Sequence, residues 1–283
     1  MQAVVEVRTD PGGLTNVGRA LHSHDSTLRI GTMVAANSGR PAGACGTFDA
    51  ARQCGAAVKL HPGHKTQEED VVSNWLLTDA YNQSVRPERQ EMHCSQVFRR
   101  RLYRRWGLSE PNGSANATLQ NVDYTAVTRP EQYSDAWVLD DVYLSSKVVR
   151  SASNEFDFSC QYPTTLYFAA GPNAGARGRS SSSSTRRTFN DAFAADYDLF
   201  RSGVKAALRA ALVAMALRGC DVALLAGVST GLYAGDHQPR LLAEFEAIVN
   251  EVLSEPIPRN AQGGAGPASL GECFVHVIWT RLA

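Results

Sequence analysis

The chain has 283 residues, with 28 basic and 28 acidic side chains. This length fits one domain spanning residues 1–283, and we expect a monomer. The balanced charge excludes a whole-surface attraction to nucleic acid or to an anionic membrane, so neither is expected as a partner. Six widely spaced cysteines without a C-x-x-C pair, and a first segment without the apolar run of a signal peptide, favour a cytoplasmic or nuclear protein over a secreted one.

The first half of the chain predicts two strands followed by two helices. Residues 2–8 and 28–36 are rich in β-branched side chains and are bounded by Gly, Pro or Asn, which is typical of strands. Apolar side chains at helical spacing, opened by a capping-box pair, predict a helix over residues 67–80. A second helix is predicted over residues 87–106, and a loop over residues 109–121.

The second half alternates strands with helices. Strands are predicted over residues 136–149, 164–170, 221–226 and 273–279, and amphipathic helices over residues 190–218 and 239–253. The Ser- and Arg-rich residues 175–187 predict a mobile loop. This alternation predicts an α/β fold of three layers, α/β/α, with a central mixed, mostly parallel sheet.

Ligands of such sheets bind at the carboxyl ends of the strands, in the loops that lead to the next helix. Two loops of this kind stand out, residues 37–67 and residues 227–238. The second contains three glycines that allow close approach of the backbone, and Ser229 and Thr230 supply hydroxyl groups. Tyr233 adds a flat aromatic face, and the helix that follows adds its positive end. A diphosphate is the predicted guest, although a glycine-rich turn that binds nothing remains an alternative.

The same loop matches G-x-S-x-G, the nucleophile motif of serine hydrolases. That chemistry needs a histidine after Ser229, and only His237 and His276 follow it. His237 is too close in sequence to lie easily on another strand, and His276 falls within a predicted strand. A serine esterase that uses Ser229 is therefore the weaker alternative.

The first loop ends in the acidic run 67–70, QEED, at the start of the predicted helix. Consecutive helix residues point about 100° apart, so Glu68 and Glu69 cannot both face one target equally. One carboxyl group could protonate a leaving sugar oxygen while the other orients a neighbour. Acidic residues at a helix start also stabilise the helix dipole without any catalytic role, and this simpler explanation stays open.

Together these segments resemble a known family. The order is a strand ending in Ala-Asn, a glycine-rich run, QEED, the segment AAGPNAG (169–175), the strand DVALLA and the loop GVSTGLYAGD. This order is similar to that of the microbial-type poly(ADP-ribose) glycohydrolases, which are macrodomain proteins. The resemblance extends from about residue 28 to residue 279 and implies a macrodomain-like fold.

The resemblance also implies roles for individual residues. Asn37 matches an asparagine that contacts the ribose near the scissile bond. Gln67, Glu68 and Glu69 match the catalytic triplet, in which Glu69 is the acid/base and Glu68 helps to hold the adjacent ribose. The residues that match the loop around the diphosphate are Val228, Ser229, Thr230, Gly231, Leu232 and Tyr233.

One segment departs from the family pattern. Three consecutive glycines are usual before the triplet, but residues 40–46 here read RPAGACG. Gly43 and Gly46 are the expected backbone contacts in this run, with residues 54–56 as the alternative. The implied substrate is ADP-ribose or poly(ADP-ribose) on modified proteins, and no metal or cofactor is implied. The departure keeps a second function open, that of a non-catalytic ADP-ribose-binding macrodomain.

Overall fold

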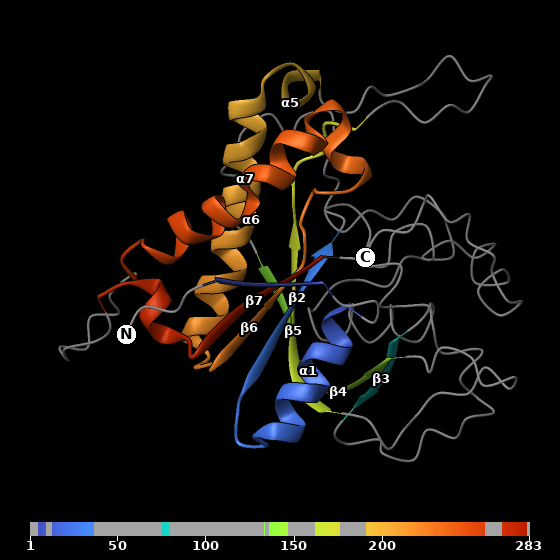
Figure 1. Ribbon diagram of the computed structural model, residues 1–283, viewed down its shortest axis with the longest axis vertical. Helices are drawn as coiled ribbons and strands as arrows, with labels where there is room; N and C mark the ends of the chain where they lie inside the picture. Colours follow the sequence, from blue (N-terminus) through green and yellow to red (C-terminus); the bar gives the residue numbers. More distant parts are fainter. Residues whose placement is uncertain are drawn as a thin grey trace, which may run out of the picture.

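Figure 1 shows the protein as a computed structural model. The structure describes residues 5–9, 13–36, 75–79, 133, 136–146, 162–175, 191–257 and 268–281. The helix predicted over residues 87–106 and the loop predicted over residues 109–121 lie outside this part of the chain. The loop predicted over residues 175–187 also lies outside it, apart from its first residue.

Within the described residues, seven strands form one sheet in the order β1-β7-β6-β2-β5-β4-β3. Neighbours from β1 to β5 are parallel, whereas β4 pairs antiparallel with β5, and β3 pairs antiparallel with β4. The strands are β1 (Val5–Thr9), β2 (Ile30–Ala36), β3 (Trp75–Asp79), β4 (Ala136–Ser146), β5 (Tyr162–Ala170), β6 (Val222–Leu225) and β7 (His276–Arg281). The mixed, mostly parallel α/β sheet expected from the sequence is confirmed.

Helices cover both faces of this sheet (Figure 1). They are α1 (Gly13–His24), α5 (Asp191–Ala195), α6 (Tyr197–Leu217) and α7 (Gln238–Leu253), with short 3-10 helices η6 (Leu232–His237) and η7 (Leu270–Cys273). Tyr162 and Tyr167 lie an odd number of positions apart in β5, so their side chains point to opposite faces of the sheet. Tyr162 packs against Gly18 of α1, whereas Tyr167 lies with Met215 of α6 around Gly31 of β2. Because side chains alternate along a strand, α1 and α6 lie on opposite faces.

Two predicted elements differ from the structure. The helix expected over residues 67–80 is wrong for residues 75–79, which form strand β3 and pair with Val142–Ser146 of β4. A short apolar run fits either element, and the neighbouring strand decides between them. The helix expected over residues 190–218 is interrupted at Asp196, whose extended backbone and carboxylate cap the N–H groups of Asp198 and Leu199 at 2.9 and 3.1 Å.

Helix α1 was not expected from the sequence. Gly18 lies in its middle, where glycine lowers helix propensity. The reason for this glycine is found in the packing, because an added Cβ would lie 2.3 Å from the hydroxyl oxygen of Tyr162. The glycine thus allows α1 to approach β5, and the buried sheet surface stabilises a helix that local preference disfavours.

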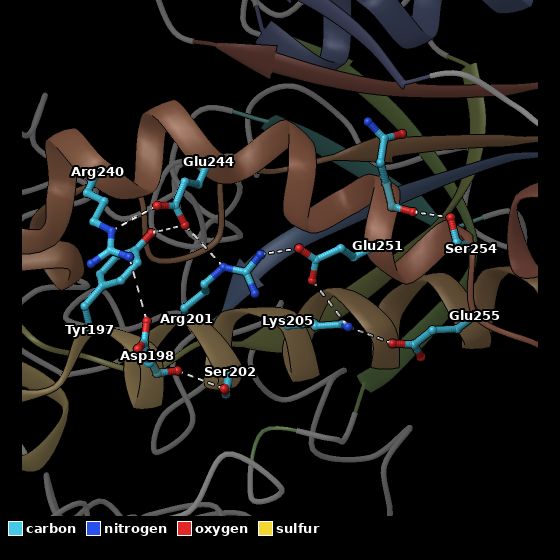
Figure 2. Close-up of polar contacts among 11 residues, drawn as sticks. Tyr197, Asp198, Arg201, Ser202, Lys205, Arg240, Glu244, Glu251, Ser254 and Glu255 are labelled. Carbon is cyan, nitrogen blue, oxygen red and sulfur yellow. Dashed lines mark hydrogen bonds and ion pairs between the residues drawn. The ribbon is translucent and has the colours of Figure 1, made fainter.

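A polar ladder joins α6 to α7, as Figure 2 shows. Arg201 binds Glu244 at 3.2 Å and also binds Glu251, while Lys205 lies 3.2 Å from Glu255. The pairs are partly exposed, so each is worth little alone, but their regular spacing fixes how the two helices align. Beneath the ladder, Phe245 of α7 packs on Trp279 of β7 with ring centroids 4.5 Å apart, and both side chains are buried.

Among the described helices, none combines the length and the apolar character that crossing a membrane requires.

Candidate functional site

The carboxyl ends of three adjacent strands, β6, β2 and β5, lie at one edge of the sheet. Strands β2 and β5 are parallel and end in register, with Ala36 beside Ala170. The structure describes two of the loops that leave this edge. We call residues 171–175 the β5 loop and residues 226–231 the β6 loop. The edge therefore brings together segments that are about 50 positions apart in the sequence.

Most carbonyl oxygens of the β6 loop accept hydrogen bonds from within the protein. The carbonyl oxygens of four loop residues accept hydrogen bonds, namely those of Ala226, Gly227, Thr230 and Gly231. Among the described residues, the backbone N–H groups of Ser229, Gly231 and Leu232 have no acceptor. Because backbone N–H groups need partners, a segment with spare donors and occupied carbonyls suits an anion.

The two loops are joined by direct contacts. The Ser229 hydroxyl donates to the Pro172 carbonyl oxygen at 2.7 Å, and the Ala174 N–H donates to the Tyr233 carbonyl oxygen at 2.7 Å. Gly235 has a positive φ of 53°, and an added Cβ there would lie 2.4 Å from the Ala174 carbonyl oxygen. The β5 loop therefore forms a rigid support for the β6 loop and the start of η6.

Gly231 differs from the other glycines near this edge. Among the described residues, its two chain neighbours aside, none has an atom within 4 Å of a Cβ added at Gly231, and the residue is exposed. At Gly227, in contrast, an added Cβ would lie 2.4 Å from Oγ1 of Thr230. The space in front of Gly231 is open, and it adjoins the N–H groups that have no acceptor. A ligand could therefore approach the backbone here, as the sequence predicted for this loop.

Both loop hydroxyls are engaged within the protein. Ser229 is 6% exposed and donates to Pro172, whereas the Thr230 hydroxyl donates to the Gly227 carbonyl oxygen at 2.8 Å. A hydroxyl carries one proton to donate. The donors that this loop offers to a ligand are therefore its backbone N–H groups.

The esterase alternative finds no catalytic base in the described part of the chain. His237 pairs through Nε2 with the Phe193 carbonyl oxygen at 2.9 Å and packs against the rings of Tyr197 and Phe200, whose centroids are each 5.3 Å from its own. His276 pairs with Glu6 at 3.1 Å on the β1–β7 side of the sheet. Within the described residues, neither of these histidines contacts the Ser229 hydroxyl, which donates to the Pro172 carbonyl oxygen instead.

The helix after the loop lies farther away than expected. The 3-10 helix Leu232–His237 separates Gly231 from α7, which begins at Gln238. The side chain of Gln238 still reaches back, and its Nε2 donates to the Thr230 carbonyl oxygen at 3.0 Å. The N-terminus of α7 thus holds the loop in shape through a side chain.

The structure describes only part of the predicted site. Val228, Ser229, Thr230 and Gly231 lie in the β6 loop, and Leu232 and Tyr233 open η6. The remaining predicted site residues lie outside the described part: Asn37, Gly43, Gly46, Gln67, Glu68 and Glu69. The structure adds Pro172, Ala174 and Gln238, which the sequence did not single out for a role. For Pro172 and Ala174, the sequence offered only their place in the segment AAGPNAG (169–175), and for Gln238 only its place in the loop over residues 227–238.

The opposite edge of the sheet carries an ion pair. Arg29 and Asp221 precede β2 and β6 and join through Nε and Oδ2 at 3.1 Å. The hydrogen bond from the Arg29 side chain holds the pKa of Asp221 below its usual 3.8, against the opposing effect of burial. This pair fixes the amino ends of the same two strands whose carboxyl ends carry the candidate site. Within the described residues, no group of three His, Cys, Asp or Glu side chains is arranged to hold a metal ion.

No protein-family model matches the chain, and no curated protein matches it. Solved structures do. Poly(ADP-ribose) glycohydrolase from Thermomonospora curvata is 14% identical with a TM-score of 0.48, and the match covers 99% of this chain and 71% of that one. The same enzyme bound to the inhibitor ADP-HPD is 14% identical with a TM-score of 0.46, covering 98% and 72%. A mutant of the Deinococcus radiodurans enzyme in complex with ADP-ribose is 14% identical with a TM-score of 0.45, covering 100% and 78%.

Proposed function

We propose that this protein binds ADP-ribose at the carboxyl edge of its sheet and hydrolyses the O-glycosidic ribose bond of ADP-ribose polymers or conjugates. One structural observation supports the binding half. Four carbonyls of the β6 loop are occupied, the N–H groups of Ser229, Gly231 and the following Leu232 have no acceptor among the described residues, and none of those residues crowds Gly231. Such a loop complements a diphosphate, which offers only acceptor oxygens.

The sequence resemblance supplies the catalytic half of the proposal. Glu69 donates its proton to the leaving ribose oxygen as the bond from that oxygen to C1 breaks. It then takes a proton from the water whose oxygen bonds to C1, which restores the acid. Glu69 must hold a proton at neutral pH for the first step, and nearby carboxylates such as Glu68 and Asp70 would favour this. The negative diphosphate, fixed by the β6 loop, stabilises the positive charge that develops on the ribose.

A non-catalytic ADP-ribose-binding protein is the second candidate. The observation that favours it is the sequence of residues 40–46, which reads RPAGACG where the resemblance leads us to expect three consecutive glycines. Methyl and thiol groups at these positions would crowd a ligand that needs bare backbone. This candidate keeps the binding role of the β6 loop and removes only turnover.

Two measurements test the proposal. Calorimetry with ADP-ribose, with ribose 5-phosphate as the control lacking a diphosphate, tests binding. Incubation with a poly(ADP-ribosyl)ated protein, followed by chromatography of released ADP-ribose, tests hydrolysis. Binding with release supports the enzyme, binding without release supports the second candidate, and the absence of binding contradicts both.

The Glu69→Gln variant separates the acid/base role from binding. We expect turnover to be lost while the ADP-ribose affinity stays within about tenfold of the parent, a change of ~1.4 kcal/mol. The exposed Glu246 on α7 provides the matched control, because Glu246→Gln makes the same chemical change away from the loops. Full turnover in Glu69→Gln would contradict the assignment of the acid/base.

A further inference from the structure

We propose that Ser229 is a positioning residue, whose hydroxyl fixes the conformation of the β6 loop by donating a hydrogen bond to the carbonyl oxygen of Pro172. The ligand part of this inference rests on the proposed function, whereas the loop-ordering part does not. It gives the serine of the G-x-S-x-G motif a role that is neither that of a nucleophile nor that of a side-chain ligand.

The environment of Ser229 supports this role. Its side chain is 6% exposed, and Oγ lies 2.7 Å from the Pro172 carbonyl oxygen. Because the one hydroxyl proton is donated to Pro172, Oγ offers only lone pairs to other groups. Lone pairs repel a phosphate oxygen, so the hydroxyl cannot serve an anion without first leaving Pro172.

The backbone of Ser229 explains why the loop needs this hydrogen bond. Ser229 has a φ of 58°, and it is the only non-glycine residue in the described part of the chain with a positive φ. Such a conformation is sparsely populated for residues with a Cβ and persists where the surroundings hold it. The hydrogen bond to Pro172 is the contact that holds it. Residue 229 begins a stretch in which three N–H groups, those of Ser229, Gly231 and Leu232, have no acceptor among the described residues.

The β5 loop is shaped to receive the Ser229 side chain. At Gly171, an added Cβ would lie 2.3 Å from the Ser229 Oγ and 2.7 Å from Val228 Cγ2. Gly171 therefore allows the two loops to approach closely enough for the hydrogen bond. The next residue of the β6 loop, Thr230, is held separately, because Nε2 of Gln238 donates to its carbonyl oxygen. Removal of the Ser229 hydroxyl should consequently loosen one side of the loop and leave the rest of the fold intact.

Hydrogen–deuterium exchange of the free protein tests the loop-ordering part. In Ser229→Ala, we expect the amides of Val228 and Thr230, which donate to the carbonyl oxygens of Ala226 and Gly227, to exchange about tenfold faster, while those of β6, residues 222–225, keep the parent rate. Ser254→Ala is the matched control, because the Ser254 hydroxyl also donates to a backbone carbonyl, that of Asn250 at 2.8 Å, and is exposed. In Ser254→Ala, the amides of the β6 loop should exchange at the parent rate.

Ser229→Gly separates the hydroxyl from the backbone conformation. Glycine adopts a positive φ readily, so a loop that depended only on φ would be ordered as well as in the parent. We expect Ser229→Gly to loosen the loop, as Ser229→Ala does, because both lack the hydroxyl. Parent exchange rates in either variant would overturn the inference. Faster exchange throughout the sheet would overturn it too, since this would show a general structural role.

The affinity for ADP-ribose provides the functional readout. We expect both variants to bind about five- to tenfold more weakly than the parent and Ser254→Ala to bind equally well. If the parent itself does not bind ADP-ribose, the proposed function fails, and the exchange result still decides whether Ser229 orders the loop. If the parent binds and the loosened variants bind equally well, the proposed function stands and the positioning role is refuted.

Discussion

Gly231→Ala is the substitution that most clearly separates ligand binding from folding. A Cβ added at Gly231 meets no atom of the described residues within 4 Å, its two chain neighbours aside, so those residues do not crowd the new methyl group. Replacing a loop glycine with alanine at a compatible site changes stability by about 1 kcal/mol or less. A phosphate oxygen that accepts from the Gly231 N–H would lie about 2.9 Å from the nitrogen, beside the new methyl group. We expect the ADP-ribose affinity to fall at least tenfold, or ~1.4 kcal/mol.

Gly235→Ala is the matched comparison, because we expect it to lower the stability of the fold, whereas Gly231→Ala should lower the ligand affinity. Its Cβ would lie 2.4 Å from the Ala174 carbonyl oxygen, and its φ of 53° disfavours a side chain. Strain and overpacking together predict a loss of about 2–4 kcal/mol in the free energy of unfolding. Urea unfolding measures stability, and calorimetry measures affinity at a temperature where both variants are folded. Parent affinity in Gly231→Ala would refute a ligand at this backbone, and an unstable Gly231→Ala would refute the open space.

Two further predictions concern the framework that carries the site. Because the folded-state pKa of Asp221 is lowered below 3.8, the stability contributed by its pair with Arg29 is present at neutral pH and is lost as the pH falls below about 4. Asp221→Asn should therefore flatten the dependence of Tm on pH between about pH 5 and pH 2, and an unchanged slope would contradict the pair. Phe245→Ala should lower the free energy of unfolding by about 3–5 kcal/mol, since it removes a buried ring from Trp279. A loss below about 1 kcal/mol in urea unfolding would contradict that packing.

The sequence predicted those elements whose local pattern agrees with their surroundings. Residues 221–226 read as a continuous apolar run, which indicates a strand covered on both faces, and Val222–Leu225 is the buried strand β6. Residues 239–253 carry an apolar stripe and correspond to α7. In both segments, the apolar positions of the sequence are the positions that the fold buries, so the local pattern is sufficient to predict the element.

Elements set by tertiary contacts escaped prediction. Helix α1 depends on the fit of Gly18 against Tyr162, a contact between residues 144 positions apart that no local pattern reveals. Strand β3 has an apolar run that suits a helix equally well, and its pairing with β4 decides its structure. The site divides in the same way. Glycines and hydroxyls indicated an anion loop, but the partner of Ser229, the carbonyl of Pro172, carries no side-chain signal at all.

The central claim is that the β6 loop receives a diphosphate on its backbone N–H groups. Titration of ¹⁵N-labelled protein with ADP-ribose, followed by amide NMR, tests it directly. The claim predicts that the amide signals of Ser229, Gly231 and Leu232 shift downfield with one common dissociation constant, and that ADP reproduces these shifts while adenosine does not. Binding of ADP-ribose that leaves these three amides unchanged would contradict it.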